Sequence, residues 1–124
     1  MRVTLSHVLI AVIFTASGIL HLVRPAPYVS IVPPWLPEPK ALVLISGVCE
    51  ILGSLGILLA STRVAAGWGL IALLVAVFPA NIQMLLDAHA AHRGPVWQAA
   101  LVARLPLQVL LIYWVYRAAV RNRR

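Results

Sequence analysis

The sequence predicts an all-α protein, an antiparallel bundle of four transmembrane helices formed by one integral membrane domain over residues 1–124. Hydrophobic residues make up 62% of the chain and charged residues 10%, with a mean hydropathy of +0.96. A soluble domain would be about one-quarter charged. Four apolar stretches are each about 20 residues or longer, which is enough to cross a hydrocarbon core roughly 30 Å thick. Because backbone polar groups cannot stay unpaired in lipid, we expect these stretches to be helices.

The first predicted helix covers about residues 3–23. A basic residue, Arg2, precedes this apolar stretch, as in a signal peptide. No small-residue cleavage site follows it, however, so we expect the helix to be retained. The loop that follows, RPAPYVSIVPPWLPEPK, holds six of the nine prolines. Proline fixes φ and lacks an N–H, so this loop cannot be a regular helix throughout. Its apolar middle should either lie on the membrane surface or fold over the bundle.

The other three predicted helices cover about residues 41–60, 64–86 and 96–119. The sequence STR between the second and third is so short that these two helices must be antiparallel neighbours. A longer loop, DAHAAHRGP, joins the third to the fourth.

Basic residues predict the orientation. Four spans place both termini on one side, together with six arginines: Arg2, Arg63, Arg117, Arg121, Arg123 and Arg124. The opposite loops hold three basic residues: Arg24, Lys40 and Arg93. Cytoplasmic loops carry an excess of Lys and Arg. We therefore expect a multi-pass protein of a bacterial-type plasma membrane with N- and C-termini in the cytoplasm. The same bias explains the net charge of +7, so we expect the lipid bilayer, and no nucleic acid, as a partner.

Several function classes lack the residues that they need. With the single cysteine Cys49, the chain can form neither an internal disulfide nor a CxxC redox pair. We find no nucleotide or haem motif, hence no identifiable cofactor. His89 and His92 lie in a loop near Asp87 without a second cluster, so we expect no metal site. His7, on the first helix, has no evident partner and is interpreted as incidental.

Five polar side chains interrupt the predicted helices in the outer half of the bundle: His21, Glu50, Asn81, Arg104 and Gln108. An ionisable side chain at mid-bilayer costs roughly 2.5–3.5 kcal/mol on insertion scales, so such residues face the bundle interior and have partners. At about 1.5 Å per residue, Glu50 lies roughly 13 Å and Arg104 roughly 12 Å below the outer surface. Opposite charges at equal depth predict an ion pair between Glu50 and Arg104.

Two prolines mark the same region. Pro79 and Pro106 each remove a backbone donor and free a carbonyl one turn earlier. We expect Asn81 and Gln108 to satisfy these carbonyls, and the resulting kinks to favour a cavity. Two interpretations of the polar cluster stay open: a structural ion pair that fixes helix packing, and a ligand-binding or proton-handling site.

Four stretches together resemble the DoxX-like family of small four-helix membrane proteins: SGILHLVRPAPYVSIVPPWLP, SGVCEILGSLGILL, FPANIQM and RLPLQVLLIYW. The family takes its name from a small subunit associated with a thiosulfate:quinone oxidoreductase, and the resemblance implies a compact four-helix bundle. The matching positions are His21, Pro25, Tyr28, Pro33, Glu50, Pro79, Asn81, Arg104, Pro106 and Gln108.

Three functions are compatible with these expectations. The first is an accessory subunit, not an enzyme on its own, that works with a membrane redox enzyme and binds a quinone or another lipophilic small molecule. In it, Arg104 and His21 would donate hydrogen bonds and Glu50 would hold Arg104. The second is an interaction or assembly protein for another membrane protein, with a purely structural Glu50–Arg104 pair. The third, a small proton-coupled exporter, is disfavoured because a paired glutamate is a poor proton carrier. The oligomeric state stays open.

Overall fold

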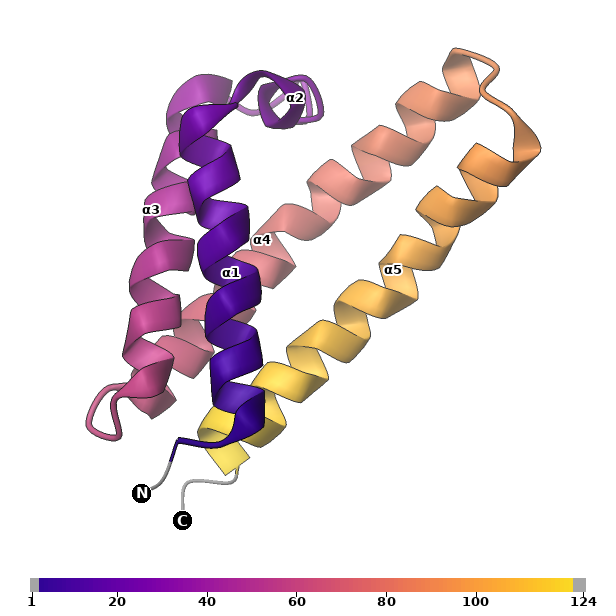
Figure 1. Ribbon diagram of the computed structural model, residues 1–124. Helices are drawn as coiled ribbons and strands as arrows, with labels where there is room; N and C mark the ends of the chain where they lie inside the picture. Colours follow the sequence, from indigo (N-terminus) through magenta and orange to yellow (C-terminus); the bar gives the residue numbers. More distant parts are fainter. Residues whose placement is uncertain (1–2, 122–124) are drawn as a thin grey trace.

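The computed structural model describes residues 3–121, and this part of the chain is helical, without strands. The helices are α1 (Leu5–Val23), α2 (Ala26–Val29), α3 (Pro39–Leu58), α4 (Arg63–Ala90), α5 (Pro95–Val115) and the π-helix η1 (Tyr116–Arg121) (Figure 1). Four of them, α1, α3, α4 and α5 continued by η1, are long and apolar enough to cross a membrane. The prediction of an all-α protein with four spans is thereby confirmed.

The observed helix limits differ from the predicted ones by a few residues. The largest differences are in α4, which ends at Ala90 rather than about residue 86, and in α5, which ends at Val115 rather than about residue 119 and is continued by η1. The last turns of α4 are held by a hydrogen bond from Gln83 Nε2 to Asp87 Oδ1 (2.8 Å). Both α3 and α5 begin with a proline, Pro39 and Pro95, at the first helical position, where the missing N–H would have no helical partner.

The long helices alternate in direction, and both ends of the described chain lie at the same end of the molecule (Figure 1). At that end, which we call the closed end, all four helices converge. At the other, the open end, the α4–α5 hairpin leans away from the α1–α3 pair. The compact bundle that the DoxX-like resemblance implied is therefore found at the closed end alone.

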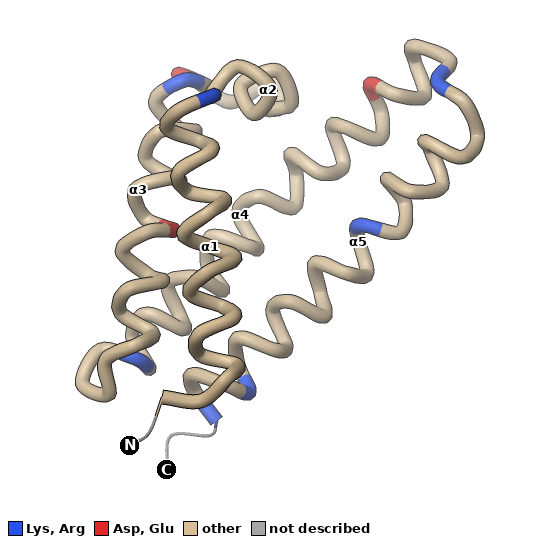
Figure 2. Tube along the Cα trace, in the orientation of Figure 1, with Lys and Arg blue, Asp and Glu red and all other residues tan. Residues whose placement is uncertain are grey.

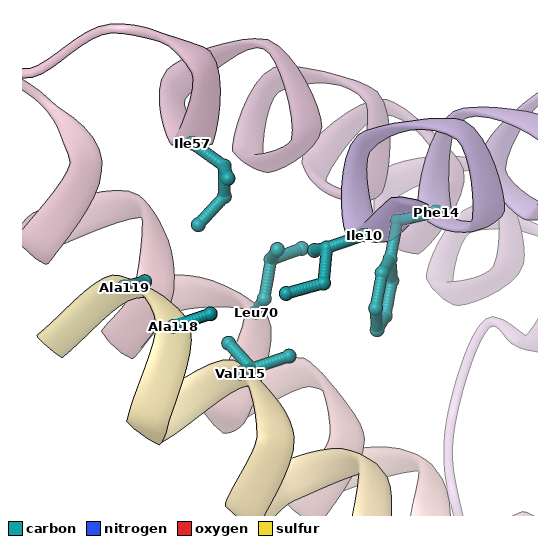
Figure 3. Close-up of a cluster of buried hydrophobic side chains, with 7 residues drawn as sticks. All are labelled: Ile10, Phe14, Ile57, Leu70, Val115, Ala118 and Ala119. Carbon is teal, nitrogen blue, oxygen red and sulfur yellow. The ribbon is translucent and has the colours of Figure 1, made fainter. Parts of the chain in front are cut away.

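An apolar core holds the closed end together (Figure 3). Its buried side chains come from four helices and η1: Ile10, Phe14, Ile57, Leu70, Val115, Ala118 and Ala119. A Cβ added to Gly67 would lie 2.6 Å from the Cβ of Ala119, so the missing side chain lets α4 and η1 pack in close contact.

His7 fastens α1 to this core. It is 2% exposed, and its Nδ1 accepts a hydrogen bond from the backbone N–H of Thr4 (3.0 Å) in a capping box. The ring proton is therefore on Nε2, which donates to the carbonyl of Ala118 (2.7 Å). The interpretation of His7 as incidental was wrong. Both nitrogens of its ring bond backbone groups, and one of these, the Ala118 carbonyl, lies 111 residues away in the sequence.

The arginines used to predict orientation lie in different settings. Arg63 is 2% exposed and donates from Nε to the carbonyl of Ile57 (2.7 Å), at the C-terminus of α3. Arg117 and Arg121 lie in η1, whereas Arg2, Arg123 and Arg124 are outside the described residues. Figure 2 shows that most charged residues gather near helix ends.

The proline-rich segment between α1 and α3 folds over the bundle. Pro25 caps the short helix α2, and the carbonyl of Pro33 accepts the N–H of Leu36 in a turn (3.0 Å). From α2 the ring of Tyr28 stacks on the ring of His21, with centroids 3.9 Å apart and an interplanar angle of 18°. The segment thus forms a cover over part of the open end.

Candidate functional site

A partly open cavity of about 590 Å³ lies in the open half of the molecule, lined by residues of all five α-helices. Its polar lining includes each of the five predicted residues: His21, Glu50, Asn81, Arg104 and Gln108. Small-molecule sites commonly have volumes of about 300–1,000 Å³ and mainly apolar walls. The walls here are apolar as well, formed among others by Phe14, Leu73, Leu74, Leu107 and Leu111.

Two glycines bring α1 and α3 close enough to share polar contacts. A Cβ on Gly18 would lie 2.6 Å from the carbonyl oxygen of Gly47. A Cβ on Gly47 would lie 2.8 Å from the Cβ of His21. Small residues at such positions allow the backbones of membrane helices to approach. The consequence is that His21 on α1 lies directly beside Glu50 on α3.

Glu50 contacts two residues of α1. Its Oε1 accepts a hydrogen bond from Ser17 Oγ (3.2 Å), and its Oε2 lies 3.3 Å from His21 Nδ1. The Nδ1 atom is closer to the carbonyl of Ser17 (2.6 Å), and a carbonyl can only accept, so Nδ1 carries a proton that points there. Oε2 is consequently buried without a hydrogen bond within residues 3–121.

The predicted ion pair between Glu50 and Arg104 was wrong: no contact of ion-pair length joins them in the described chain. The two residues sit on the helices that lie furthest apart in Figure 1, α3 and α5. Arg104 is exposed on its wall of the cavity, and its Nη1 donates to Met84 Sδ (3.2 Å). Two residues at the same depth in the membrane can pair only if their helices are neighbours, and depth does not show which helices these are. In the structure α3 lies beside α1 and not beside α5.

Asn81 and Gln108 connect α4 to α5. Asn81 Nδ2 donates to Gln108 Oε1, and Gln108 Nε2 donates to the carbonyl of Leu74. Gln108 is 4% exposed. Pro79 lies within α4 and Pro106 within α5, and neither ends its helix. The expectation that these amides satisfy the carbonyls freed by the prolines was wrong: Asn81 donates to Gln108, and Gln108 donates to the Leu74 carbonyl, one residue before the carbonyl that Pro79 frees.

Sequence reasoning missed two contributors to the cavity. Tyr28 was noted only as a matching position, yet its ring covers His21. Met84, three residues after Asn81, supplies the hydrogen-bond acceptor of Arg104. The spacing of Asn81 and Met84 on one helical face was a usable signal. Within residues 3–121, no three His, Cys, Asp or Glu side chains are grouped as metal ligands would be.

The four apolar helices define the class: the chain is a multi-pass helical membrane protein with a mainly apolar cavity, which carries the five polar side chains, between its helices. Residues 10–119 match the model of the family described as "Domain of unknown function (DUF8561)", so the chain belongs to that family. No curated protein and no solved structure matches the chain.

Proposed function

We propose that the protein is an accessory membrane subunit of a redox or quinone-linked system, and that it holds a lipophilic small molecule in the cavity between its helices. The single observation that carries this proposal is the cavity itself: five polar side chains from four helices line one apolar-walled space. The resemblance to the DoxX-like family supports the redox context, and it makes a quinone the first candidate for the occupant.

The lining offers both kinds of hydrogen-bonding group. Arg104 presents N–H donors that a ring carbonyl can accept. Glu50 Oε2 is an acceptor without a donor in the described chain. A polar head held by Arg104 would leave its apolar part against Phe14 and Leu107. In this revised proposal Glu50 is held by Ser17 beside His21 and does not position Arg104.

Binding is tested on the purified full-length protein in a neutral detergent. A short-chain quinone analogue should raise the thermal midpoint and bind saturably. Arg104→Ala should weaken its binding by about tenfold, as expected for loss of a hydrogen bond from a charged group. Arg93→Ala is the control, because Arg93 lies outside the cavity in the α4–α5 turn. No stabilisation of the wild type, or equal binding by the two variants, would count against the proposal.

The proposed orientation places both termini in the cytoplasm of a bacterial-type cell, with the open end toward the outer surface. The sequence supports it, because six arginines flank the helix ends on the side of the termini and three basic residues lie in the opposite loops. Single cysteines introduced at Ser30 and Ser61 of a Cys49→Ala protein test it in intact cells. A membrane-impermeant maleimide should label position 30 and not position 61; the reverse pattern would invert the orientation.

An interaction or assembly protein is the second candidate, favoured by the contacts of Glu50. Its partners Ser17 and His21 are protein groups on the adjacent helix, as a purely structural clasp requires. A double-mutant cycle of Glu50→Gln and His21→Phe in detergent should then show coupling, with no effect of any lipophilic ligand. The exporter remains the third candidate, because the objection based on an arginine counter-ion no longer applies. Loss of drug resistance in cells carrying Glu50→Gln would support it.

A further inference from the structure

Arg104 brings a positive charge to the cavity without a carboxylate partner. Within residues 3–121, its one hydrogen bond runs from Nη1 to Met84 Sδ. A thioether sulfur is a weak acceptor, whereas a guanidinium has five N–H donors and remains charged in proteins. A charge inside a membrane-spanning helix is costly unless it is paired or solvated. The side chain is therefore short of a counter-charge at the very place where it lines the cavity.

None of the three acidic residues of the chain supplies that counter-charge. Glu50 contacts Ser17 and His21 on the far wall. Asp87 accepts a hydrogen bond from Gln83, and Glu38 lies in the segment before α3. Within residues 3–121 no carboxylate is therefore paired with Arg104, and a bound anion can take that place.

The neighbouring amides give no substitute. Gln108 Oε1, the acceptor nearest along α5, already takes a hydrogen bond from Asn81. Gln108 Nε2 is used by the Leu74 carbonyl. The other walls of the cavity are mainly apolar and include Leu73, Leu107 and Leu111. The cavity thus combines the cation of Arg104 with a largely hydrocarbon surface.

We propose that the cavity binds an amphiphile with an anionic head, a carboxylate or a phosphate monoester, which accepts hydrogen bonds from Arg104 while its alkyl chain lies on the apolar walls. Guanidinium and carboxylate or phosphate form paired, charge-assisted hydrogen bonds. This inference rests on the proposed function, in which the cavity holds a lipophilic molecule, and adds the charge of its head. A neutral quinone would leave Arg104 without a counter-charge.

The volume argues for a small molecule rather than a protein segment. The cavity measures about 590 Å³, within the range of roughly 300–1,000 Å³ that is common for small ligands. A transmembrane helix needs about 20 residues to cross the bilayer, and it would not fit in such a space. An anionic amphiphile satisfies the charge, the apolar walls and the volume together.

The test compares four probes on the purified full-length protein in neutral detergent: dodecanoate, dodecyl phosphate, dodecanol and inorganic phosphate. Thermal midpoints and calorimetric titrations are measured alongside the quinone analogue. We expect the two anionic amphiphiles to bind at least about tenfold more tightly than dodecanol, the ratio expected for a hydrogen bond to a charged group. Inorganic phosphate, which lacks a chain, should bind more weakly than dodecyl phosphate.

Variants separate the cavity from the net charge of the protein. Arg104→Gln should reduce the preference for dodecanoate over dodecanol to less than about threefold, and Arg104→Lys should retain only part of it, because lysine keeps the charge but lacks the paired donors. Arg93→Gln should leave the preference unchanged, because Arg93 does not line the cavity. An equal loss in Arg93→Gln and Arg104→Gln would assign the preference to general charge and overturn the inference.

The remaining outcomes are also decisive. Equal binding of dodecanol and dodecanoate overturns the inference on charge and leaves the proposed lipophile site intact. Equal binding of inorganic phosphate and dodecyl phosphate overturns the amphiphile in favour of a free anion. Failure of every probe and of the quinone analogue overturns the proposed function as well. If Arg104→Gln does not fold, the comparison of head groups on the wild type and on Arg104→Lys decides.

Discussion

The imidazole of His21 has its place because Gly47 has no side chain. The Cβ that Gly47 lacks would lie 2.8 Å from the Cβ of His21 and 2.9 Å from the carbonyl oxygen of Gly18. Real Cβ atoms do not approach other heavy atoms this closely. Contact between α1 and α3, the position of His21 and its proximity to Glu50 therefore depend on one missing methyl group.

Gly47→Ala should destabilise the protein. The added methyl group forces α1 and α3 apart, at a cost of about 1–3 kcal/mol for overpacking, against a gain of up to about 1 kcal/mol in helix propensity. The free energy of unfolding is measured by titration with SDS in mixed micelles. Gly69→Ala is the matched control, since a Cβ there meets nothing within 4 Å, and it should be neutral or stabilising. Gly47→Ala that is as stable as Gly69→Ala would show that the helices do not depend on this contact.

His7→Ala should loosen the closed end. It removes the hydrogen bond to the Ala118 carbonyl and one half of the capping box at Thr4. The loss of both should lower the free energy of unfolding by about 1–3 kcal/mol. His92→Asn, in the exposed α4–α5 turn, serves as control and should change it little, because asparagine tolerates the left-handed backbone of this position (φ 54°). Equal stability of the two variants would contradict the role given to His7.

Gln108→Leu should uncouple α5 from α4. It leaves the Asn81 amide and the Leu74 carbonyl without their cross-helix partner. A double-mutant cycle with Asn81→Leu should give a coupling of about 0.6–1.7 kcal/mol, the range found for hydrogen bonds between membrane helices. Gln83→Leu, at a half-buried position of α4 whose side chain donates to Asp87, should show no coupling with Asn81→Leu. Additive effects of Gln108→Leu and Asn81→Leu would mean that the amide contact carries no energy.

Tyr28→Ala should release the segment between α1 and α3 from its contact with His21 and so lower the stability of the protein. The stacked rings of Tyr28 and His21 are worth about 0.5–1.5 kcal/mol in comparable aromatic pairs. We expect a loss of that size in the free energy of unfolding, while Tyr28→Phe should retain the stacking and the stability. Trp35→Ala, in the same segment but exposed, should be close to neutral. A larger effect of Trp35→Ala than of Tyr28→Ala would refute the assignment.

The sequence predicted the elements better than their partners. Hydropathy identifies the four spans because the bilayer sets their length. Depth along each helix likewise predicted that Glu50, Asn81 and Arg104 belong to one half of the molecule. Depth is a single coordinate, however, and a pair also requires that two helices face each other. The mistaken pairing of Glu50 with Arg104 came from this missing information.

Part of that information was present in the small residues. Gly18 and Gly47 mark the faces along which α1 and α3 meet, and small residues are typical of such contacts. The lean of the α4–α5 hairpin could not be inferred in the same way. It follows from where large side chains fill the core, at Ile10, Leu70 and Val115 near the closed end, and from packing angles that a linear pattern does not specify.

The apolar core lies at the closed end and the cavity at the open end, so different residues form each of them. The buried side chains of the apolar core are different from those that line the cavity, apart from Phe14, which belongs to both. Selection can therefore alter the lining of the open end while the scaffold is conserved. Across the family, specificity should diverge at positions such as 84, 104 and 107 while positions 10, 70 and 115 remain constrained, so that one architecture serves several occupants.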